Sequence, residues 1–152
     1  MSLREAFTAE VKTAMLARDA ARVSALRMIT AKLKDIDIAA RPKGVDQVPD
    51  EEIVAMLRGM VKSRRESVDL YRQGNRPELV AKEEAEIAVI EAFLPTQMDQ
   101  AATEAAVAEA VAETGATTVK DMGRVMAALK ARHAATLDMA RVGPLVRAKL
   151  GA

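Results

Sequence analysis

The sequence predicts an all-α protein. Half of the 152 residues are hydrophobic but only 2% are aromatic, so a core must be built from Leu, Val, Ile, Met and many Ala. Alanine and long unbranched side chains are the best helix formers, and the residues that favour strands never alternate here with a period of two. A chain of this length buries roughly two thirds of its unfolded surface, enough for one domain or two small helical units. We expect an N-terminal bundle of about four helices and a C-terminal unit of about three.

The first two helices are defined by their caps and by a break. Ser2 and Glu5 form the S-x-x-E pattern of a capping box, and the first helix ends near Arg18. Asp19 can cap a second helix that continues to about Ala40, where the sequence Arg41-Pro42-Lys43-Gly44 interrupts it. Apolar residues recur at helical spacing through both segments, at Leu3, Phe7, Val11 and Met15 and then at Val23, Leu26, Ile29, Leu33 and Ile36.

The next two helices form a candidate hairpin. Asp50 begins the third helix, which ends at Gly74, a residue that tolerates a left-handed C-cap. Asn75 and Pro77 open the fourth helix, which ends at Leu94-Pro95 because proline excludes its predecessor from helical geometry. The apolar face of the third helix contains Ile53, Leu57, Met60, Val61, Val68 and Tyr71.

A joint between two units is expected at Leu94 to Met98, which divides the chain into residues 1–95 and 96–152. Asp99 begins an alanine-rich helix that runs to Glu113 and is ended by Gly115. Thr118 and Asp121 form another capping box, for a helix that bears Met122, Val125, Met126 and Leu129. A loosely patterned stretch, 132–143, leads to Pro144 and a short last helix.

Charge is segregated along the chain, although the net charge is only +1. Residues 77–113 hold 1 basic and 9 acidic side chains, whereas residues 114–152 hold 7 basic and 2 acidic ones. A basic tail that can neutralise phosphates is a candidate nucleic-acid surface, although no aromatic residue is present in it to stack on exposed bases. The candidate residues are Lys120, Arg124, Lys130, Arg132, Arg141, Arg147 and Lys149.

A second basic stripe is expected on the third helix, opposite its apolar face. At 100° per residue its members fall within about 80° of one another. The stripe is either the solvated face of a bundle helix or a surface that contacts a polyanion. Its members are Arg58, Lys62, Arg65, Asp69 and Arg72.

One pair of charges is predicted to be structural. Arg64 falls in the centre of the apolar stripe of the third helix, and Glu83 falls in the equivalent place on the fourth. If Gly74 and Asn75 join these helices as an antiparallel hairpin, the two side chains lie nearly opposite each other. Because an unpartnered buried charge costs several kcal/mol, we expect an ion pair between them that is partly shielded from water.

Residues for catalysis and cofactor binding are scarce. The chain has no cysteine and only one histidine, His133, so we expect no zinc site, no metal and no other cofactor. No phosphate-cradling G-x-x-x-x-G-K-[ST] loop is present. The acidic run of Glu83, Glu84, Glu86 and Glu91 fits a solvated helix face better than a magnesium site. We expect no catalytic residue.

Several short motifs follow at fixed spacing in the second half of the chain: Glu86-Ile87, Phe93-Leu94-Pro95, Thr114-Gly115-Ala116 and the run from Lys120 to Met126. With Arg27-Met28, Lys62-Ser63-Arg64 and Tyr71-Arg72-Gln73-Gly74 upstream, they resemble the GatB/YqeY family over nearly the whole chain. The resemblance is to the helical tail of the B subunit of the tRNA-dependent amidotransferase, without the domain that carries the chemistry.

This resemblance implies a tail that contacts tRNA, and a family associated with carbon-nitrogen ligase activity that uses glutamine as the amide donor. The chain departs from the family at one loop. Many members have a Lys-Gly-Arg run and then Asp-Gly before the last helix, whereas this chain has Ala134-Ala135-Thr136-Leu137-Asp138-Met139 and keeps only the aspartate. The departure removes basic residues from the implied RNA contact.

The sequence therefore predicts a non-catalytic module that binds tRNA or associates with an amidotransferase. The alternative is a protein-protein interaction module without an RNA ligand, in which the acidic fourth helix or the alanine-rich helix docks another protein. Candidate partners are tRNA, amidotransferase subunits or another protein, and a membrane is not among them. With no cysteine, no signal-peptide-like run and no apolar segment of roughly 20 residues, we expect a cytoplasmic protein.

Overall fold

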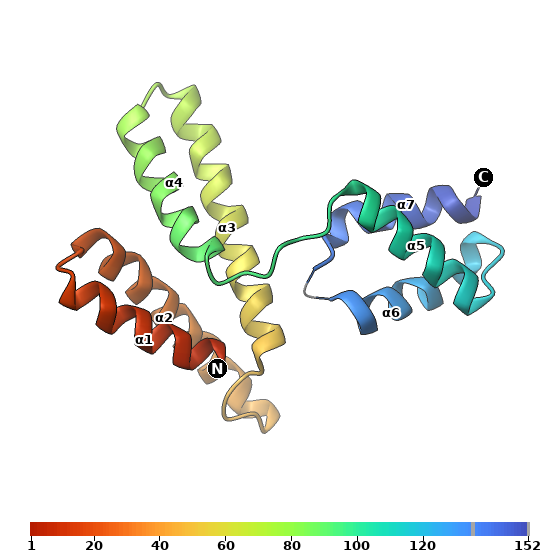
Figure 1. Cartoon of the computed structure of the whole chain (residues 1–152), viewed down its shortest axis with the longest axis horizontal. Coiled ribbons are helices and arrows are strands. Elements are labelled where there is room, and N and C mark those ends of the chain that lie inside the picture. The colour runs from red at the N-terminus through yellow and green to blue at the C-terminus, as the bar shows by residue number, and fades with distance from the viewer. Residues whose placement is uncertain (135, 152) are drawn as a thin grey trace. The chain divides into compact units, whose positions relative to one another are not determined.

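The computed structural model describes residues 1–134 and 136–151, and it confirms the all-α class: within these residues there are helices and turns but no strand. The contacts divide the chain into two compact units, Met1–Leu94 and Pro95–Ala152. The helices, shown in Figure 1, are α1 (Leu3–Leu16), α2 (Ala20–Ala40), α3 (Asp50–Gln73), α4 (Pro77–Glu91), α5 (Gln100–Thr114), α6 (Met122–His133) and α7 (Met139–Gly151), with short 3₁₀ turns η1 (Arg41–Lys43) and η2 (Val119–Asp121).

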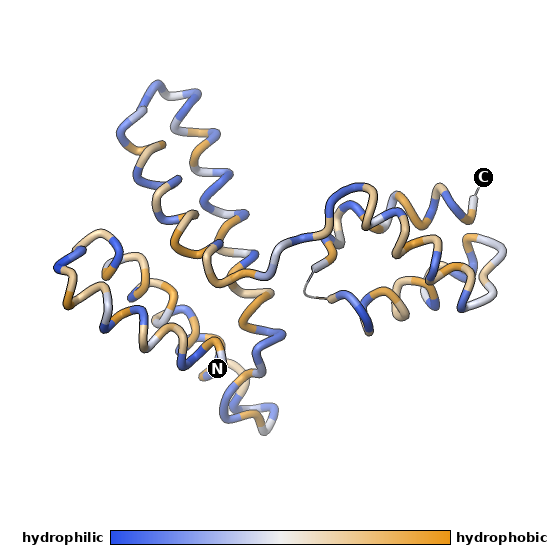
Figure 2. Tube along the Cα trace, viewed as in Figure 1, coloured by the Kyte–Doolittle hydropathy of each residue, from blue (hydrophilic) through white to orange (hydrophobic). Residues whose placement is uncertain are grey.

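The first unit contains two helical hairpins, α1 with α2 and α3 with α4 (Figure 1). Apolar residues recur along each helix (Figure 2) and meet in one core. The two phenylalanines of the chain, Phe7 and Phe93, pack edge to face with their ring centroids 4.9 Å apart and the ring planes at 84°. Phe93 is partly buried, whereas Phe7 is fully buried, as are the large side chains of Leu26, Ile29, Ile53, Leu57 and Ile90. Burying a side chain of this size contributes about 1.5–3 kcal/mol.

The second unit packs α5, α6 and α7 around its own core of Val107, Val125, Leu129, Val142 and Val146. Asp99 caps α5 by accepting the backbone N–H of Ala102 at 2.8 Å, and Gly115 ends that helix with a φ of +65°. Both ends agree with the sequence. The backbone N–H of Met98 donates to the carbonyl of Thr136 at 2.8 Å, which ties the start of this unit to the segment before α7.

Two helix ends in the first unit differ in position from those expected, and a third agrees in position but not in backbone conformation. The first helix ends at Leu16, and Arg18 then adopts a φ of +57° in the turn to α2. Between α3 and α4 it is Asn75 that adopts the left-handed conformation, with a φ of +53°, whereas Gly74 has a φ of −83°. Asparagine tolerates this region better than most residues do. The fourth helix ends at Glu91, because the amides of Phe93 and Leu94 bond three residues back and tighten the last turn before Pro95.

The last helix was expected to begin at Pro144, and this is wrong. The helix begins at Met139, and Pro144 lies inside it. Asp138 starts the helix instead: its carboxylate accepts the N–H of Ala140 at 3.0 Å, and its carbonyl accepts those of Arg141 and Val142. Because proline has no N–H, this helix forgoes one internal hydrogen bond.

Candidate nucleic-acid interface in the second unit

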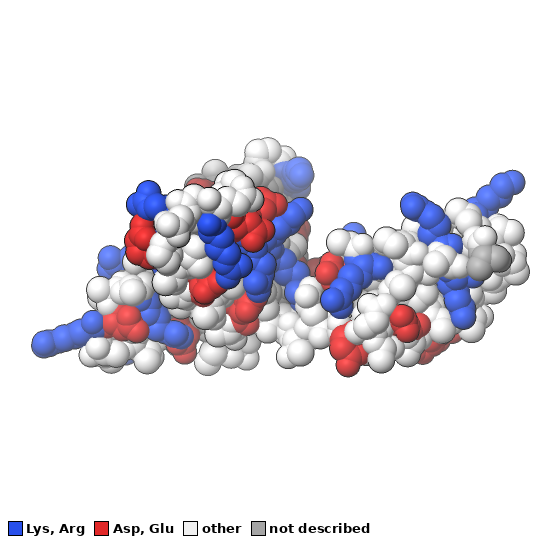
Figure 3. Space-filling model, turned by 90° about the horizontal axis from the view of Figure 1, so that it is seen from above, with Lys and Arg blue, Asp and Glu red and all other residues white. Residues whose placement is uncertain are grey.

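The predicted basic residues of the tail lie on η2, α6 and α7, and all seven are exposed. The acidic residues of the second unit lie mainly on or just before α5, at Asp99, Glu104, Glu109 and Glu113. In Figure 3, basic side chains lie at several places on the visible face of the second unit, and most of its visible acidic side chains lie along its lower edge. The unit therefore carries its two signs of charge on different helices.

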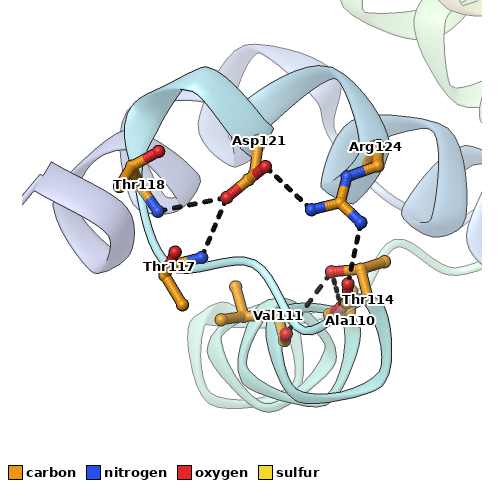
Figure 4. A network of polar contacts seen from close by, with 7 residues as sticks. All are labelled: Ala110, Val111, Thr114, Thr117, Thr118, Asp121 and Arg124. Carbon is orange, nitrogen blue, oxygen red and sulfur yellow. Dashed lines mark hydrogen bonds and ion pairs between the residues drawn. The ribbon is translucent and has the colours of Figure 1, made fainter.

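The motif from Lys120 to Met126 is organised around the carboxylate of Asp121 (Figure 4). Asp121 accepts the backbone N–H of Thr117 at 3.0 Å and that of Thr118 at 3.2 Å. The expected capping box of Thr118 and Asp121 is present, although it opens η2 rather than α6 itself. These contacts are local, and they fix the turn that leads into η2 and α6.

Three hydrogen bonds lower the pKa of Asp121 from 3.8 to about 2. The backbone N–H of Thr117 is the largest cause, the guanidinium of Arg124 the second, and the N–H of Thr118 the third. Each of these donors stabilises the ionised carboxylate, so the group stays charged far below neutral pH.

Arg124 is held in the same network. One of its nitrogens, Nη2, donates to Asp121 at 2.7 Å, and Nη1 donates to the carbonyl of Thr114 at 3.1 Å, at the C-terminal end of α5 (Figure 4). The guanidinium thus satisfies a helix-end carbonyl and neutralises a carboxylate. The other basic residue of this motif, Lys120, has no carboxylate within 4.0 Å in residues 1–134 and 136–151.

Arg132 is also paired within the unit. Its Nη1 donates to Glu113 at 2.7 Å and to Glu109 at 3.1 Å, so it bridges α6 and α5. The two carboxylates raise the pKa of Arg132 above its ordinary value. Its contribution to a positive surface is therefore cancelled locally.

The five remaining cations of the tail have no carboxylate within 4.0 Å among the described residues. On α7, Arg141 and Arg147 are six residues apart, which separates them by about 120° around the helix. The charges therefore cover a broad surface rather than one stripe. These residues are Lys120, Lys130, Arg141, Arg147 and Lys149. Of the loop that departs from the family pattern, Ala135 lies outside the described residues.

The basic stripe predicted on α3 is largely compensated by α4. Arg72 pairs with Glu84 at 2.7 Å, and Arg65 pairs with Glu91. Lys62 is exposed, and Arg58 is only partly exposed. The helical periodicity of α3 places these cations on one face. It gives no information about α4, which supplies the carboxylates that pair with Arg65 and Arg72.

Arg64 and Glu83 form an ion pair at 3.2 Å, and Arg64 also pairs with Glu86, one turn further along α4. The three side chains are 12%, 17% and 13% exposed. Arg64 also directs Nη2 at the sulfur of Met28 on α2, 3.6 Å away. This cluster is part of the architecture of the first unit.

A second internal charge cluster was not anticipated. Arg4 on α1 makes two hydrogen bonds to Asp37 on α2, at 2.7 and 2.8 Å, and its guanidinium also donates to the carbonyl of Val48 at 2.9 Å. Asp37 in turn accepts the N–H of Val48 at 2.9 Å. The Arg4 side chain is the main reason that the pKa of Asp37 is lowered. Arg4, Asp37 and Val48 lie in three segments that are far apart in the sequence, so this contact becomes apparent only from the folded structure.

Within the part of the chain that the structure describes, no group of three or more His, Asp or Glu side chains is arranged to hold a metal ion. His133 lies in the last turn of α6 and is partly exposed. Every helix in the described residues is too short or too polar to cross a bilayer.

The structure thus defines a protein of two all-α units, the second of which carries exposed cations on η2, α6 and α7. The family model of the "Yqey-like protein" matches residues 4–150, and the chain belongs to this family. The coarse prediction from the sequence motifs is thereby confirmed.

Among curated proteins, the chain is similar to "Altered inheritance of mitochondria protein 41, mitochondrial" from three yeasts. Identity is 34% for the protein of Eremothecium gossypii, 29% for that of Lachancea thermotolerans and 27% for that of Saccharomyces cerevisiae. Each match covers 85 residues, which are 56% of this chain. The matched part is 45% of the first relative and 44% of the other two, so the chain matches less than half the length of these relatives.

These relatives contradict the cytoplasmic location that was expected from the sequence, because their names place them in mitochondria. The expectation depended on missing cysteines and missing long apolar runs. Both features bear on secretion and membrane insertion, and neither distinguishes the cytosol from a mitochondrial compartment.

Proposed function

We propose that the chain is a non-catalytic tRNA-binding module whose second unit contacts phosphates of the RNA backbone. The observation that carries this proposal is the set of five exposed cations on η2, α6 and α7 that have no carboxylate within 4.0 Å in the described part of the chain. Uncompensated cations release condensed counterions when they meet phosphates, which drives association with nucleic acid.

Shape and backbone, rather than base identity, are the expected basis of recognition. The second unit contains neither of the two phenylalanines, nor the tyrosine, and the chain has no tryptophan. Stacking on unpaired bases therefore contributes nothing there. A folded RNA that presents phosphates along a curved surface fits such a site better than a flexible single strand does.

An association with a tRNA-dependent amidotransferase is the further part of this proposal, and it is supported by the family resemblance. In that setting the chain would hold the tRNA while the enzyme supplies the chemistry. A shared complex on one tRNA, seen as co-migration of both proteins with the RNA, is the observation to seek once tRNA binding is established.

The test is a titration of the whole chain into fluorescently labelled tRNA, read by anisotropy at several salt concentrations. Lys120→Ala/Lys130→Ala is the test variant, because both lysines are exposed and neither has a carboxylate within 4.0 Å among the residues that the structure describes. Lys12→Ala/Lys34→Ala removes the same charge from exposed positions of the first unit and is the matched control. An unstructured RNA of equal length controls for fold.

Tight binding that prefers tRNA and weakens in the Lys120/Lys130 variant is the expected result. If each lysine contacts one phosphate, the slope of log K against log salt should fall by about 1.5 in that variant and stay unchanged in the control. Equal effects of the two variants, or equal binding of the unstructured RNA, would refute the proposal and favour a protein-interaction module without an RNA ligand.

A further inference from the structure

The first unit contains an open groove along one face of α2. Its first part, of about 680 Å³, lies at the start of α2 and includes Met15 and Val23 in its walls. Its second part, of about 720 Å³, lies between α2 and α3 and includes Met56 and Met60. Met28 lines both parts, so the two depressions meet at its side chain.

The α2 residues along the groove are spaced as in a helix-packing surface. Ala20, Ser24, Met28, Lys32 and Ile36 follow one another at intervals of four, and Val23, Arg27 and Ala31 form a parallel row. Rows of this kind are the ridges between which the side chains of a second helix interdigitate. From Ala20 to Ile36 the groove extends about 24 Å, which matches a helix of about four turns.

The floor of the groove is apolar and adaptable. Met15 and Met28 are 54% and 45% exposed, and Met56 and Met60 are partly exposed. Methionine side chains are flexible and polarisable, and for this reason they recur on surfaces that receive helices of other proteins. The exposed methionines would lose contact with water only when such a partner covers them.

Besides Arg64, which is paired with Glu83 and Glu86, three cations line the groove: Arg18, Arg27 and Lys32. All three are exposed, and among the described residues none of them has a carboxylate within 4.0 Å. Two carboxylates also line the second part, but Glu83 is already paired with Arg64, which leaves only Glu52. The α2 side of the groove is therefore positively charged, which favours an acidic occupant.

We propose that this groove binds an amphipathic helix of a partner protein, whose apolar stripe covers the methionines and whose carboxylates pair with Arg18, Arg27 and Lys32. A nucleic acid would leave the methionine floor unused, and no aromatic side chain lines the groove to stack on a base. The proposal concerns the first unit and does not depend on tRNA binding by the second.

The test uses the whole chain and a fluorescein-labelled, end-blocked peptide of 18 residues, with leucines in an i, i+3, i+4, i+7 stripe and glutamates elsewhere. Two comparison peptides carry the same residues without a stripe, or lysines in place of the glutamates. Arg18→Glu/Arg27→Glu reverses the charge beside the groove, and Met28→Asp places a charge on its floor. Leu70→Asp makes a similar change at a 66% exposed residue of α3 that does not line the groove.

The acidic amphipathic peptide should bind, and both comparison peptides should bind at least tenfold more weakly. Met28→Asp should weaken binding by about tenfold or more, since it removes an apolar contact at the centre of the interface. Arg18→Glu/Arg27→Glu should weaken the acidic peptide about tenfold and strengthen the lysine peptide. Leu70→Asp should change neither, and circular dichroism checks that every variant is folded.

Other outcomes would overturn the proposal. If the striped and unstriped acidic peptides bind equally well, binding depends on charge attraction alone and not on an apolar stripe. A wild-type dimer in sedimentation velocity that Met28→Asp dissociates would make the groove a contact between two copies of this chain. Binding to phosphatidylglycerol vesicles that the same variants abolish, without binding of the peptide, would assign the groove to a lipid surface.

Discussion

Replacing Arg64 by methionine is expected to destabilise the first unit by about 2–3 kcal/mol. The substitution keeps an unbranched side chain but removes the cation that pairs with both Glu83 and Glu86. Among the described residues neither carboxylate has another cation within 4.0 Å, so both are left without compensation, one turn apart on α4. Breaking a fully buried ion pair costs about 3–5 kcal/mol. The three side chains here are 12–17% exposed, so water offsets part of that cost and the lower value follows.

Removing all three charges should restore most of the lost stability. In the triple variant Arg64→Met/Glu83→Gln/Glu86→Gln no charge is left without a partner, and buried ion pairs are often replaced by neutral groups without net loss. Glu83→Gln alone should cost about 1 kcal/mol or less, because Arg64 keeps Glu86 as its partner. The free energy of unfolding therefore depends on whether each buried charge has a partner of opposite sign, not on the number of charges.

Urea unfolding followed by tyrosine fluorescence measures these differences. Tyr71 is the only tyrosine in a chain without tryptophan, and it lies on α3, so its signal reports on the first unit. The free energies are compared at unchanged m-value. A free energy of unfolding for Arg64→Met within 0.5 kcal/mol of the wild-type value would refute the reasoning. A triple variant no more stable than Arg64→Met would show that the arginine stabilises through the packing of its methylene groups instead.

Two further predictions concern the other internal carboxylates. Asp37→Asn should lower the stability of the first unit by about 1–2 kcal/mol at pH 7, because it weakens two charge-assisted bonds to Arg4. Since the pKa of Asp37 is lowered on folding, its contribution is present above the ordinary value near 3.8 and is lost as pH falls through the folded pKa. Urea midpoints of the two proteins should therefore converge as the pH falls below 3.8, and a constant gap would contradict this. Asp121 should titrate at about 2 by carboxyl ¹³C NMR, and Arg124→Ala should raise the pKa without restoring 3.8, since the Thr117 N–H is the larger cause. Lys120→Ala is the matched control and should leave the pKa unchanged; an unperturbed wild-type value would refute the network.

Helix ends could be predicted where a single local signal decides them. Asp99 and Gly115 bound α5 because a side-chain cap and a left-handed glycine act within one turn. Where two signals compete, the sequence misleads: Pro144 fits the first turn of a helix, but Asp138 caps the backbone six residues earlier and the helix starts there. The turn after α3 likewise offered two candidates, Gly74 and Asn75, and the less flexible residue took the left-handed position.

Charges on one helix could be placed from the sequence, whereas their partners on other helices could not. Arg65 and Glu91 are 26 residues apart and Arg4 and Asp37 are 33 apart, so no periodicity connects them. Arg64 and Glu83 were an exception because a charge in the middle of an apolar stripe demands a partner, and the hairpin offered one place for it. Even there Glu86 was missed, since Glu83 alone satisfied that demand.

Ion pairs also involve most of the acidic residues in segment 77–113. Seven of the nine acidic residues in 77–113 are engaged in ion pairs: Glu78, Glu83, Glu84, Glu86, Glu91, Glu109 and Glu113. These seven carboxylates share five arginines, so most of their charge, though not all, is compensated at close range and the negative field that this segment offers to a basic partner is reduced. Among the described residues of the tail, five of seven cations remain uncompensated. Pairing thus weakens the idea that the acidic fourth helix docks a partner by its charge, and it leaves the tail with a positive field that phosphates would experience.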